Sequence, residues 1–145
     1  MELKEILQGV MLFTGLTDEE IDQVAAICNQ RTMKKGEVLA EQGSPGDEFY
    51  IVTSGFMEVS IRGKDEARAI VNLGRGQIIG EMSLVDHGPR SATIRAISDH
   101  ASVQVIRRDQ FEKLCEQNTH IGYIVMKDIA ADMSFKLRHR NLMIG

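Results

Sequence analysis

The middle of the chain has the hydrophobic period of β-strands, whereas both ends have the period of α-helices. From about Arg31 onward apolar and polar residues alternate, for example where Met57, Val59 and Ile61 alternate with polar neighbours. Such alternation places one side of an extended strand against a core and the other side in water. Most of the 13 glycines fall between these runs, where chain reversals need them. Short strands separated by glycine turns predict an antiparallel barrel or jelly roll.

The N-terminal end predicts two short helices. Leu3 and Leu7 lie on one face of the first helix, because they are separated by about one helical turn. Thr17 and Glu20 have the spacing of a capping box that begins the second helix. Apolar residues then repeat at helical intervals as far as Cys28. We therefore expect helices in the N-terminal part and strands after it.

Helical spacing returns at the C-terminal end. Asp109 is placed to cap one helix, and a longer helix is expected from about His120 to Asn141. The predicted fold is therefore mainly β with flanking α: a jelly-roll barrel (an antiparallel double-stranded β-helix) with short N-terminal helices and two C-terminal helices. We expect a single domain over 1–145, with N-terminal helices in 1–30, the barrel in 31–107 and C-terminal helices in 108–145.

Composition and charge exclude several functional classes. The 145 residues carry a net charge of −4, which disfavours a general nucleic-acid-binding surface. The longest apolar runs are only a few residues, too short for a transmembrane span, and the N-terminus lacks the layout of a signal peptide. We therefore expect a cytoplasmic protein with no membrane span.

The cysteines and histidines do not predict a catalytic or metal site. Cys28 and Cys115 lack the spacing of a metal site or a redox pair, and the four histidines are scattered along the sequence. A cupin-like metal enzyme, one alternative for a barrel of this size, needs histidines and a carboxylate that converge inside the barrel. We expect no catalytic residues, no metal and no enzymatic activity.

Residues 79–93 interrupt the strand pattern. The run 81–86 is long enough for a short helix, and Gly88 and Pro89 favour its termination. The first amide groups of a helix lack internal partners and attract an anion. Gly80 lets a ligand approach the backbone without a Cβ atom in the way. This short helix therefore predicts a small anion site within the barrel.

Two charged residues indicate which anion would fit this site. Arg90 has a guanidinium suited to phosphate oxygens, whereas the carboxylate of Glu81 would repel a phosphate. The presence of Glu81 is explained if its carboxylate accepts a hydrogen bond from a sugar hydroxyl while Arg90 offsets the charges of both the carboxylate and the phosphate. A ligand with one phosphate charge beside a free ribose hydroxyl meets these demands, and a cyclic nucleotide has both.

Residues 79–93 resemble the phosphate-binding cassette of the cyclic-nucleotide-binding domains. This family includes domains of the catabolite activator protein, of cyclic-nucleotide-dependent kinases and of cyclic-nucleotide-gated channels. Its cassette reads Phe-Gly-Glu, two small or apolar residues, Leu, a variable run, and then Arg, Ser/Thr/Ala, Ala and Thr. This chain has Ile79 in place of the Phe and otherwise follows that pattern, and 46–55 is similar to the family's Gly-Asp…Tyr-Ile…Gly run. The resemblance covers essentially the whole chain and implies a sensor of cAMP, or of cGMP.

The resemblance also implies a role for each part of the site. Glu81 would hold the ribose 2′-hydroxyl and Arg90 the cyclic phosphate. Ser91 would contact the phosphate or the base, or would only be a small residue that fits. The residues implied to contact phosphate and ribose are Gly80, Glu81, Met82, Ser83, Arg90 and Ser91. Those implied to enclose the base are Val59, Ile70 and Leu73 from strands and Leu137, Arg138, Arg140 and Asn141 from a helical lid.

Two features leave alternatives open. Arg90 could form a structural ion pair with Glu81 or Asp86, in a degenerate module of the same fold that binds no nucleotide and serves structure or dimerisation. The apolar stripe of the last helix either packs against the barrel or forms the seam of a homodimer, because it continues to Ile144. This stripe comprises Met126, Ile129, Met133 and Leu137.

The expected output is movement of the C-terminal helix. Nucleotide is expected to pull the short 80–86 helix inward, after which the 120–141 helix closes over the base. Because the chain stops at Gly145, without a helix-turn-helix region, we expect no DNA binding by this chain alone. It would act on a protein effector in trans, or as one piece of a longer protein.

Overall fold

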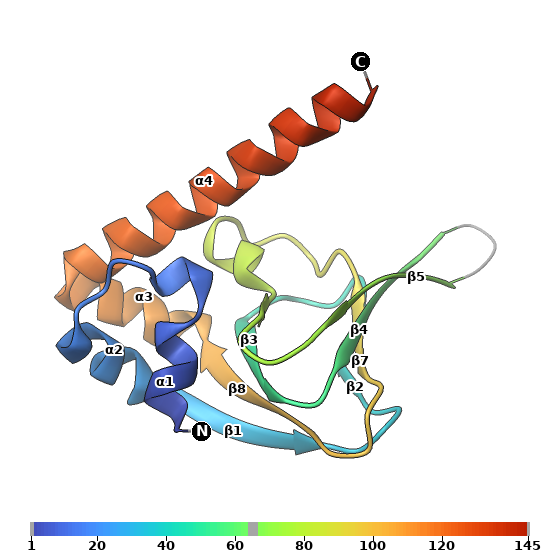
Figure 1. Ribbon diagram of the computed structural model, residues 1–145, viewed down its shortest axis with the longest axis horizontal. Helices are drawn as coiled ribbons and strands as arrows, with labels where there is room; N and C mark the ends of the chain where they lie inside the picture. Colours follow the sequence, from blue (N-terminus) through green and yellow to red (C-terminus); the bar gives the residue numbers. More distant parts are fainter. Residues whose placement is uncertain (1, 64–66, 145) are drawn as a thin grey trace.

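The computed structural model describes residues 2–63 and 67–144, with side chains for residues 2–63 and 71–139. The described chain runs from helices through a β-barrel to helices, and the helices gather at one end of the barrel (Figure 1). The N-terminal elements are α1 (Leu3–Gln8), the 3-10 turn η1 (Met11–Phe13) and α2 (Asp18–Ala25).

The predicted capping box begins α2. The side-chain oxygen of Thr17 accepts a hydrogen bond from the backbone N–H of Glu20 at 3.2 Å, and the Glu20 carboxylate accepts one from the backbone N–H of Thr17 at 3.0 Å. The helix ends at Ala25, so the prediction that Cys28 continues its apolar face is wrong. Cys28 instead begins the first strand, opposite Ile106, and the barrel therefore starts slightly before residue 31. An apolar residue at helical spacing can equally be the inward residue of a following strand.

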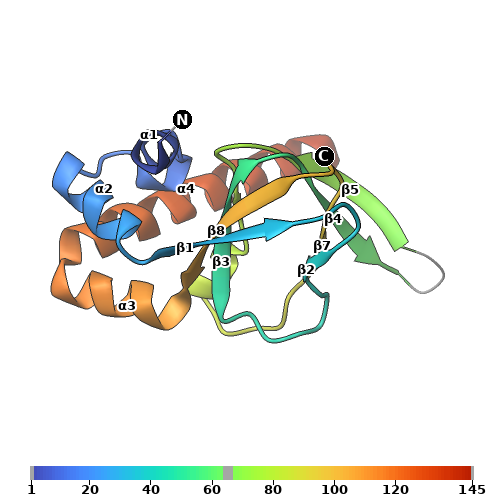
Figure 2. The same ribbon diagram turned by 90° about the horizontal axis from the view of Figure 1, so that it is seen from below.

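The barrel consists of two four-stranded antiparallel sheets, which confirms the predicted jelly-roll fold (Figure 2). The first sheet has the order β1-β8-β3-β6 and the second the order β2-β7-β4-β5. The strands of the first sheet are β1 (Cys28–Met33), β8 (Ala101–Arg107), β3 (Glu48–Ser54) and β6 (Ile78–Ile79). Those of the second are β2 (Val38–Ala40), β7 (Thr93–Ala96), β4 (Met57–Arg62) and β5 (Ala67–Leu73).

Strand β3 is buried on both of its faces. Tyr50 and Val52 belong to the core inside the barrel, whereas Phe49 and Ile51 belong to a second core beneath the helices. Successive side chains on a strand point in opposite directions, so β3 contacts both cores at once. Phe49 meets Phe111 of the C-terminal helices edge to face, with 5.4 Å between ring centroids.

The C-terminal part forms α3 (Arg108–Gln117) and α4 (Thr119–Ile144). Arg107, not Asp109, is the N-cap residue of α3, so the predicted cap is wrong. The Asp109 carboxylate instead accepts a hydrogen bond from the backbone N–H of Gln110 and forms an ion pair with Arg107 at 3.2 Å. Among the described helices, none combines the length and the apolarity that a membrane span requires.

The buried face of α4 is not the one that the sequence predicted. Ile121, Val125 and Ile129 are buried in one hydrophobic core with residues of α1, η1, α2 and α3. Of the predicted stripe, Ile129 alone belongs to this face, and the other three residues are exposed: Met126, Met133 and Leu137. Packing of those three against the barrel was a wrong expectation, because the C-terminal part of α4 runs past the barrel (Figure 1).

Glu20 connects the start of α4 to α2. Its carboxylate is buried and lies 2.8 Å and 2.9 Å, through its two oxygens, from His120 Nδ1. It also accepts a hydrogen bond from the Asn118 amide at 3.0 Å, and the Asn118 side chain in turn accepts one from the backbone N–H of His120. Burial would raise the pKa of Glu20, but the hydrogen bonds from Thr17, His120 and Asn118 outweigh it and hold the pKa below its usual value.

Candidate functional site

The cassette turns sharply after β6. Gly80 has a φ of +81°, in the left-handed region that favours glycine, and the 3-10 turn η2 (Glu81–Leu84) follows. The helix expected over 81–86 is therefore shorter and more tightly wound. The return of the chain is fixed by a bridge between Pro45 and Pro89.

A cavity of about 710 Å³ lies between the cassette, strands β4 and β5, η1 and α4. Its lining includes every residue expected to contact phosphate and ribose: Gly80, Glu81, Met82, Ser83, Arg90 and Ser91. Val59 and Leu73, expected beside the base, also line it. The side chains of Ile70, Arg140 and Asn141 lie outside the described residues. Leu137 and Arg138 are exposed and are not among the lining residues.

Arg90 extends through a narrow passage between Gly46 and Gly80. A Cβ atom at position 46 would lie 3.3 Å from Arg90 Nε, and one at position 80 would overlap Arg90 Nη1. Nη2 donates hydrogen bonds to the backbone carbonyl of Glu48 and, at 3.4 Å, to the Tyr50 hydroxyl. The two glycines thus leave the room through which the guanidinium reaches the cavity.

Arg90 is not held by a carboxylate in the described structure. Within residues 2–63 and 71–139 it forms no ion pair, either with Glu81 or with Asp86. Its positive charge faces a cavity, and its bonded partners are a carbonyl and a phenol. This arrangement leaves the charge available to an anionic group.

Glu81 and Ser83 supply polar groups on the cassette side of the cavity. Burial raises the pKa of the Glu81 carboxyl, an effect that Lys136 opposes and Asp132 reinforces. The hydroxyl oxygen of Ser83 is buried and forms no hydrogen bond with another described residue. Opposite these groups, Val59, Leu73 and other aliphatic side chains form an apolar wall. The cavity therefore combines a cation, a carboxylate and a hydroxyl with an apolar surface.

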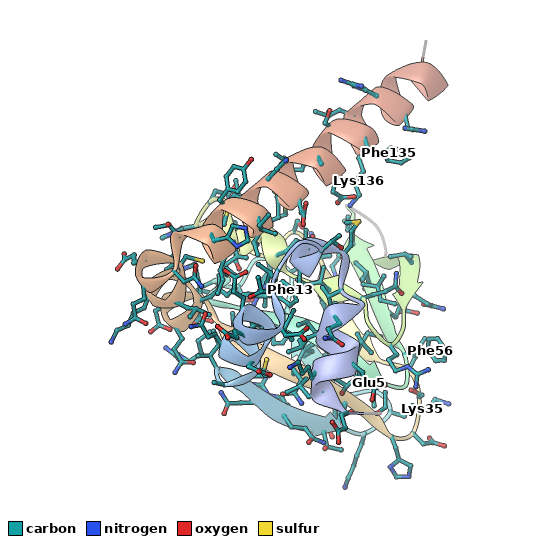
Figure 3. All side chains as sticks on the ribbon, turned by 60° about the vertical axis from the view of Figure 1, so that its left-hand side comes forward. Glu5, Phe13, Lys35, Phe56, Phe135 and Lys136 are labelled. Atoms are coloured by element: carbon teal, nitrogen blue, oxygen red, sulfur yellow. The ribbon has the colours of Figure 1, made fainter. Side chains whose placement is uncertain are left out.

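Sequence reasoning missed two α4 residues that line the cavity. Asp132 and Lys136 form an ion pair at 2.9 Å, and Figure 3 shows Lys136 extending from α4 toward the barrel. They continue the buried face of Ile121, Val125 and Ile129, because each residue follows the one before it by three or four positions. That spacing was the signal that could have identified them. Met11 of η1 also lines the cavity, and nothing in the sequence indicated it.

The described histidines do not form a metal site. His120 contacts Glu20, and His87 lies 3.8 Å from Glu112. In the described part of the chain, no group of three or more His, Cys, Asp or Glu residues is arranged to hold a metal ion. The convergence of ligands that a cupin-like metal enzyme needs is therefore not found among these residues.

A family model for the cyclic nucleotide-binding domain matches residues 30–118, which include the cassette and most of the cavity. The chain belongs to the cyclic nucleotide-binding domain family. This confirms the resemblance that the sequence of the cassette indicated. The matched residues run from β1 to the residue that precedes α4.

Proteins similar to this domain include a protein kinase and a cyclic AMP receptor protein. The chain is 30% identical over 134 residues, 92% of its length, to a cGMP-dependent protein kinase of Eimeria tenella. It is 30% identical over 139 residues, 94% of its length, to the cyclic AMP receptor protein of Thermus thermophilus. The crystal structure of Thermus thermophilus catabolite activator protein matches it with a TM-score of 0.80 at 30% identity, over 92% of this chain and 61% of that one. The domain spans 13% of the kinase and 61% of the cyclic AMP receptor protein.

Proposed function

We propose that this domain binds a 3′,5′-cyclic purine nucleotide, cAMP or alternatively cGMP, and acts as a regulatory sensor without catalytic activity. The observation that carries the proposal is Arg90, which lines the cavity together with Glu81 and forms no ion pair with a described carboxylate. A guanidinium in such a place suits a phosphate. The names of the two relatives, one cGMP-dependent and one a receptor for cyclic AMP, support this ligand class.

The cavity supports one orientation of the nucleotide. The cyclic phosphate would lie against Arg90 and the backbone of the cassette, and Glu81 would accept a hydrogen bond from the ribose 2′-hydroxyl. The base would then rest on the apolar wall that includes Val59 and Leu73. Ser91 lines the same cavity, so its hydroxyl is available to the phosphate or to an amino group of the base.

Calorimetric titration of the purified domain tests this proposal. Wild type should bind cAMP, and we expect cAMP to bind more tightly than cGMP. Linear 5′-AMP should bind far more weakly, because its phosphate carries more charge and is not fixed to the ribose by a ring. Titration of Ser91→Ala with both cyclic nucleotides then shows whether the hydroxyl favours guanine. Absence of binding to either cyclic nucleotide would identify the domain as a degenerate, non-binding module.

The α4 helix would transmit the signal. Asp132 and Lys136 line the cavity from α4, so a bound nucleotide would contact this helix as well as the cassette. A ligand shifts a conformational equilibrium only by its difference in affinity for the two states, and contacts with α4 would supply that difference. The moved helix would act on a protein effector, or on a further region of a longer protein, in the cytoplasm.

In a homodimer formed through α4, this movement would change the contacts between the two subunits. Five α4 residues follow one another at intervals of three, four, three and four, the spacing of a coiled-coil seam. All five are exposed: Tyr123, Met126, Ala130, Met133 and Leu137. This seam lies on a different side of α4 from Asp132 and Lys136, so one helix could contact nucleotide and partner at the same time.

A further inference from the structure

Arg90 lines two cavities, and both hydrogen bonds that its side chain donates to described residues go to residues that border the second one. The second cavity, of about 420 Å³, is bordered by Arg90, Glu48 and Tyr50. On that side, Nη2 of Arg90 is bonded to the Glu48 carbonyl and to the Tyr50 hydroxyl. Of the five N–H groups of a guanidinium, those on Nε and Nη1 have no acceptor among the described residues. The protein contacts therefore fix one nitrogen and leave the others to a ligand.

The Tyr50 side chain has the geometry to direct the guanidinium. The residue is 2% exposed, so packing inside the barrel fixes its ring. The ring centroid lies 5.3 Å from Arg90 Cζ, within the distance at which a cation is attracted to an aromatic face. Ring and hydroxyl thus contact the same guanidinium, and the hydroxyl contact depends on direction more than the ring contact does.

Glu48 determines whether the Tyr50 hydroxyl donates or accepts in its hydrogen bond with Arg90. The hydroxyl donates a hydrogen bond of 2.6 Å to the Glu48 carboxylate, and Arg31 contacts the same carboxylate oxygen at 3.4 Å. Because the single phenolic hydrogen is committed to Glu48, the phenol can only accept from Arg90. Burial, followed by this bond to Glu48, raises the pKa of Tyr50, so the phenol stays protonated.

We propose that Tyr50 is a positioning residue for the phosphate site: its hydroxyl, oriented by Glu48, fixes the direction from which Arg90 meets the cyclic phosphate. This inference rests on the proposed binding of a cyclic nucleotide. Tyr50 itself touches no ligand in this account. Its effect is exerted through Arg90, and it should therefore change how the two exocyclic phosphate oxygens are distinguished.

The test uses Tyr50→Phe, which keeps the buried ring and removes the hydroxyl alone. The probes are the two phosphorothioate diastereomers of the nucleotide that wild type binds, in which sulfur replaces one or the other exocyclic oxygen. Sulfur accepts a hydrogen bond more weakly than oxygen, so the ratio of the two Kd values reports the direction of the guanidinium. In Tyr50→Phe we expect this ratio to move toward one by about threefold to tenfold, the range for one hydrogen bond.

Two further variants separate positioning from structure. Thr53→Val removes another hydroxyl from β3, one that pairs with Ser102 at 2.7 Å, and should leave the ratio unchanged. Glu48→Ala should move the ratio toward one with Tyr50 intact, whereas Glu48→Gln, whose amide oxygen still accepts the phenolic hydrogen, should keep the ratio close to that of wild type. If Tyr50→Phe does not fold, the comparison of Glu48→Ala with Glu48→Gln still tests the inference.

Two results would overturn the inference: a wild-type ratio of one, or an unchanged ratio in Tyr50→Phe, whether that variant binds both diastereomers as wild type does or binds both equally more weakly. Each of these leaves the proposed function standing, provided that wild type binds the unmodified nucleotide. Failure of wild type to bind any cyclic nucleotide would instead remove the proposed function, and this inference with it.

Discussion

Arg90 depends on two glycines for its path to the cavity, and the two act for different reasons. Gly80 needs both a left-handed backbone and free space, since its φ is +81° and a Cβ atom would overlap Arg90. Gly46 has no positive φ, so its backbone conformation accepts other residues. A larger residue at position 46 is restricted only by Arg90, whose Nε would lie 3.3 Å from an added Cβ atom. Gly46 is therefore a position where the path of Arg90 can be disturbed without straining the backbone.

Gly46→Ala should weaken nucleotide binding with little loss of stability. The added Cβ atom displaces the guanidinium by a few tenths of an ångström, and we expect a loss of affinity of about threefold to tenfold, comparable to that of one hydrogen bond. Gly80→Ala should lower both affinity and thermal stability, because an alanine would also be strained in the left-handed backbone conformation of this position. Calorimetry and thermal unfolding measure the two effects. Unchanged affinity in Gly46→Ala would show that this glycine does not define the path of Arg90.

At this scale, all six cassette residues chosen from the sequence line one cavity, whereas Leu137 and Arg138, chosen for the lid, do not line it. Arg90, Glu81 and their neighbours are adjacent in the chain, so their chemistry could be combined before any fold was known. The α4 residues come from a separate element, and their orientation depends on which helical face is buried. An error of one position rotates a helical residue by about 100°. Leu137 was expected at the cavity, whereas its neighbour Lys136 lines it.

Among the elements, α4 is anchored at its start and projects beyond the barrel at its end. Its first three turns carry Ile121, Val125 and Ile129 in the core, and Glu20 holds its first residues through His120 and Asn118. The part that follows contributes the cavity-lining side chains. An element fixed at one end only is suited to a change in position when a ligand contacts its other part.

The Glu20 contacts should make stability depend on pH. Because the pKa of Glu20 is lowered in the folded protein, its contribution is fully present above its ordinary pKa of about 4.5 and is lost as the pH falls through the lowered value. Glu20→Gln should cost about 1.5–3 kcal/mol at neutral pH, the range for hydrogen bonds to a charged group. It should also flatten the loss of stability below pH 4.5.

Chemical denaturation across this pH range provides the measurement. Glu19→Gln on the exposed side of the same helix is the matched control, and it should resemble wild type. If Glu20→Gln follows the wild-type pH profile, then other carboxylates account for the acid sensitivity.

Removal of the cavity-lining part of α4 tests its role as a lid. A chain that ends at Ala131 keeps the three buried anchors and loses Asp132 and Lys136. It should stay folded by circular dichroism and should bind nucleotide more weakly. The double variant Asp132→Ala/Lys136→Ala should reproduce much of that loss in a helix of full length. A folded, shortened domain that binds as tightly as wild type would show that α4 is not a lid.

For the whole molecule, the change of hydrophobic period predicted the fold correctly because a helix and a strand with one buried face differ in that period, although β3 is buried on both faces. The predicted boundaries of helices and strands were less accurate where the spacing of apolar residues fits both kinds of element, as at Cys28. The choice of buried face on α4 could not be made from the sequence alone. The helix has two apolar stripes about 100° apart, one with Ile121 and Val125 and one with Met126 and Met133. Only the position of the other helices decides which of them is covered by the domain itself.

The stripe that the domain leaves exposed should make the protein a dimer. Wild type should show twice the monomer mass by light scattering at micromolar concentration, and Leu137→Glu should be monomeric, because a charge in the seam would be buried without a partner. Leu137 is 57% exposed in the chain by itself, so this substitution should not affect folding. Ala131→Glu, an exposed position outside the seam, is the control and should remain dimeric. A monomeric wild type would exclude the seam.

The most direct test of the account compares Arg90→Ala with Arg95→Ala by titration with cAMP and cGMP. Both substitutions remove one arginine charge within a few residues of each other, but Arg90 lines the cavity and Arg95 is exposed on β7. Truncating one partner of a buried, hydrogen-bonded charge pair costs about 2–5 kcal/mol. Arg90→Ala should therefore lose at least about 30-fold in affinity while remaining folded, and Arg95→Ala should bind as wild type does. Equal affinities for the two variants would contradict the assignment of this cavity as the nucleotide site.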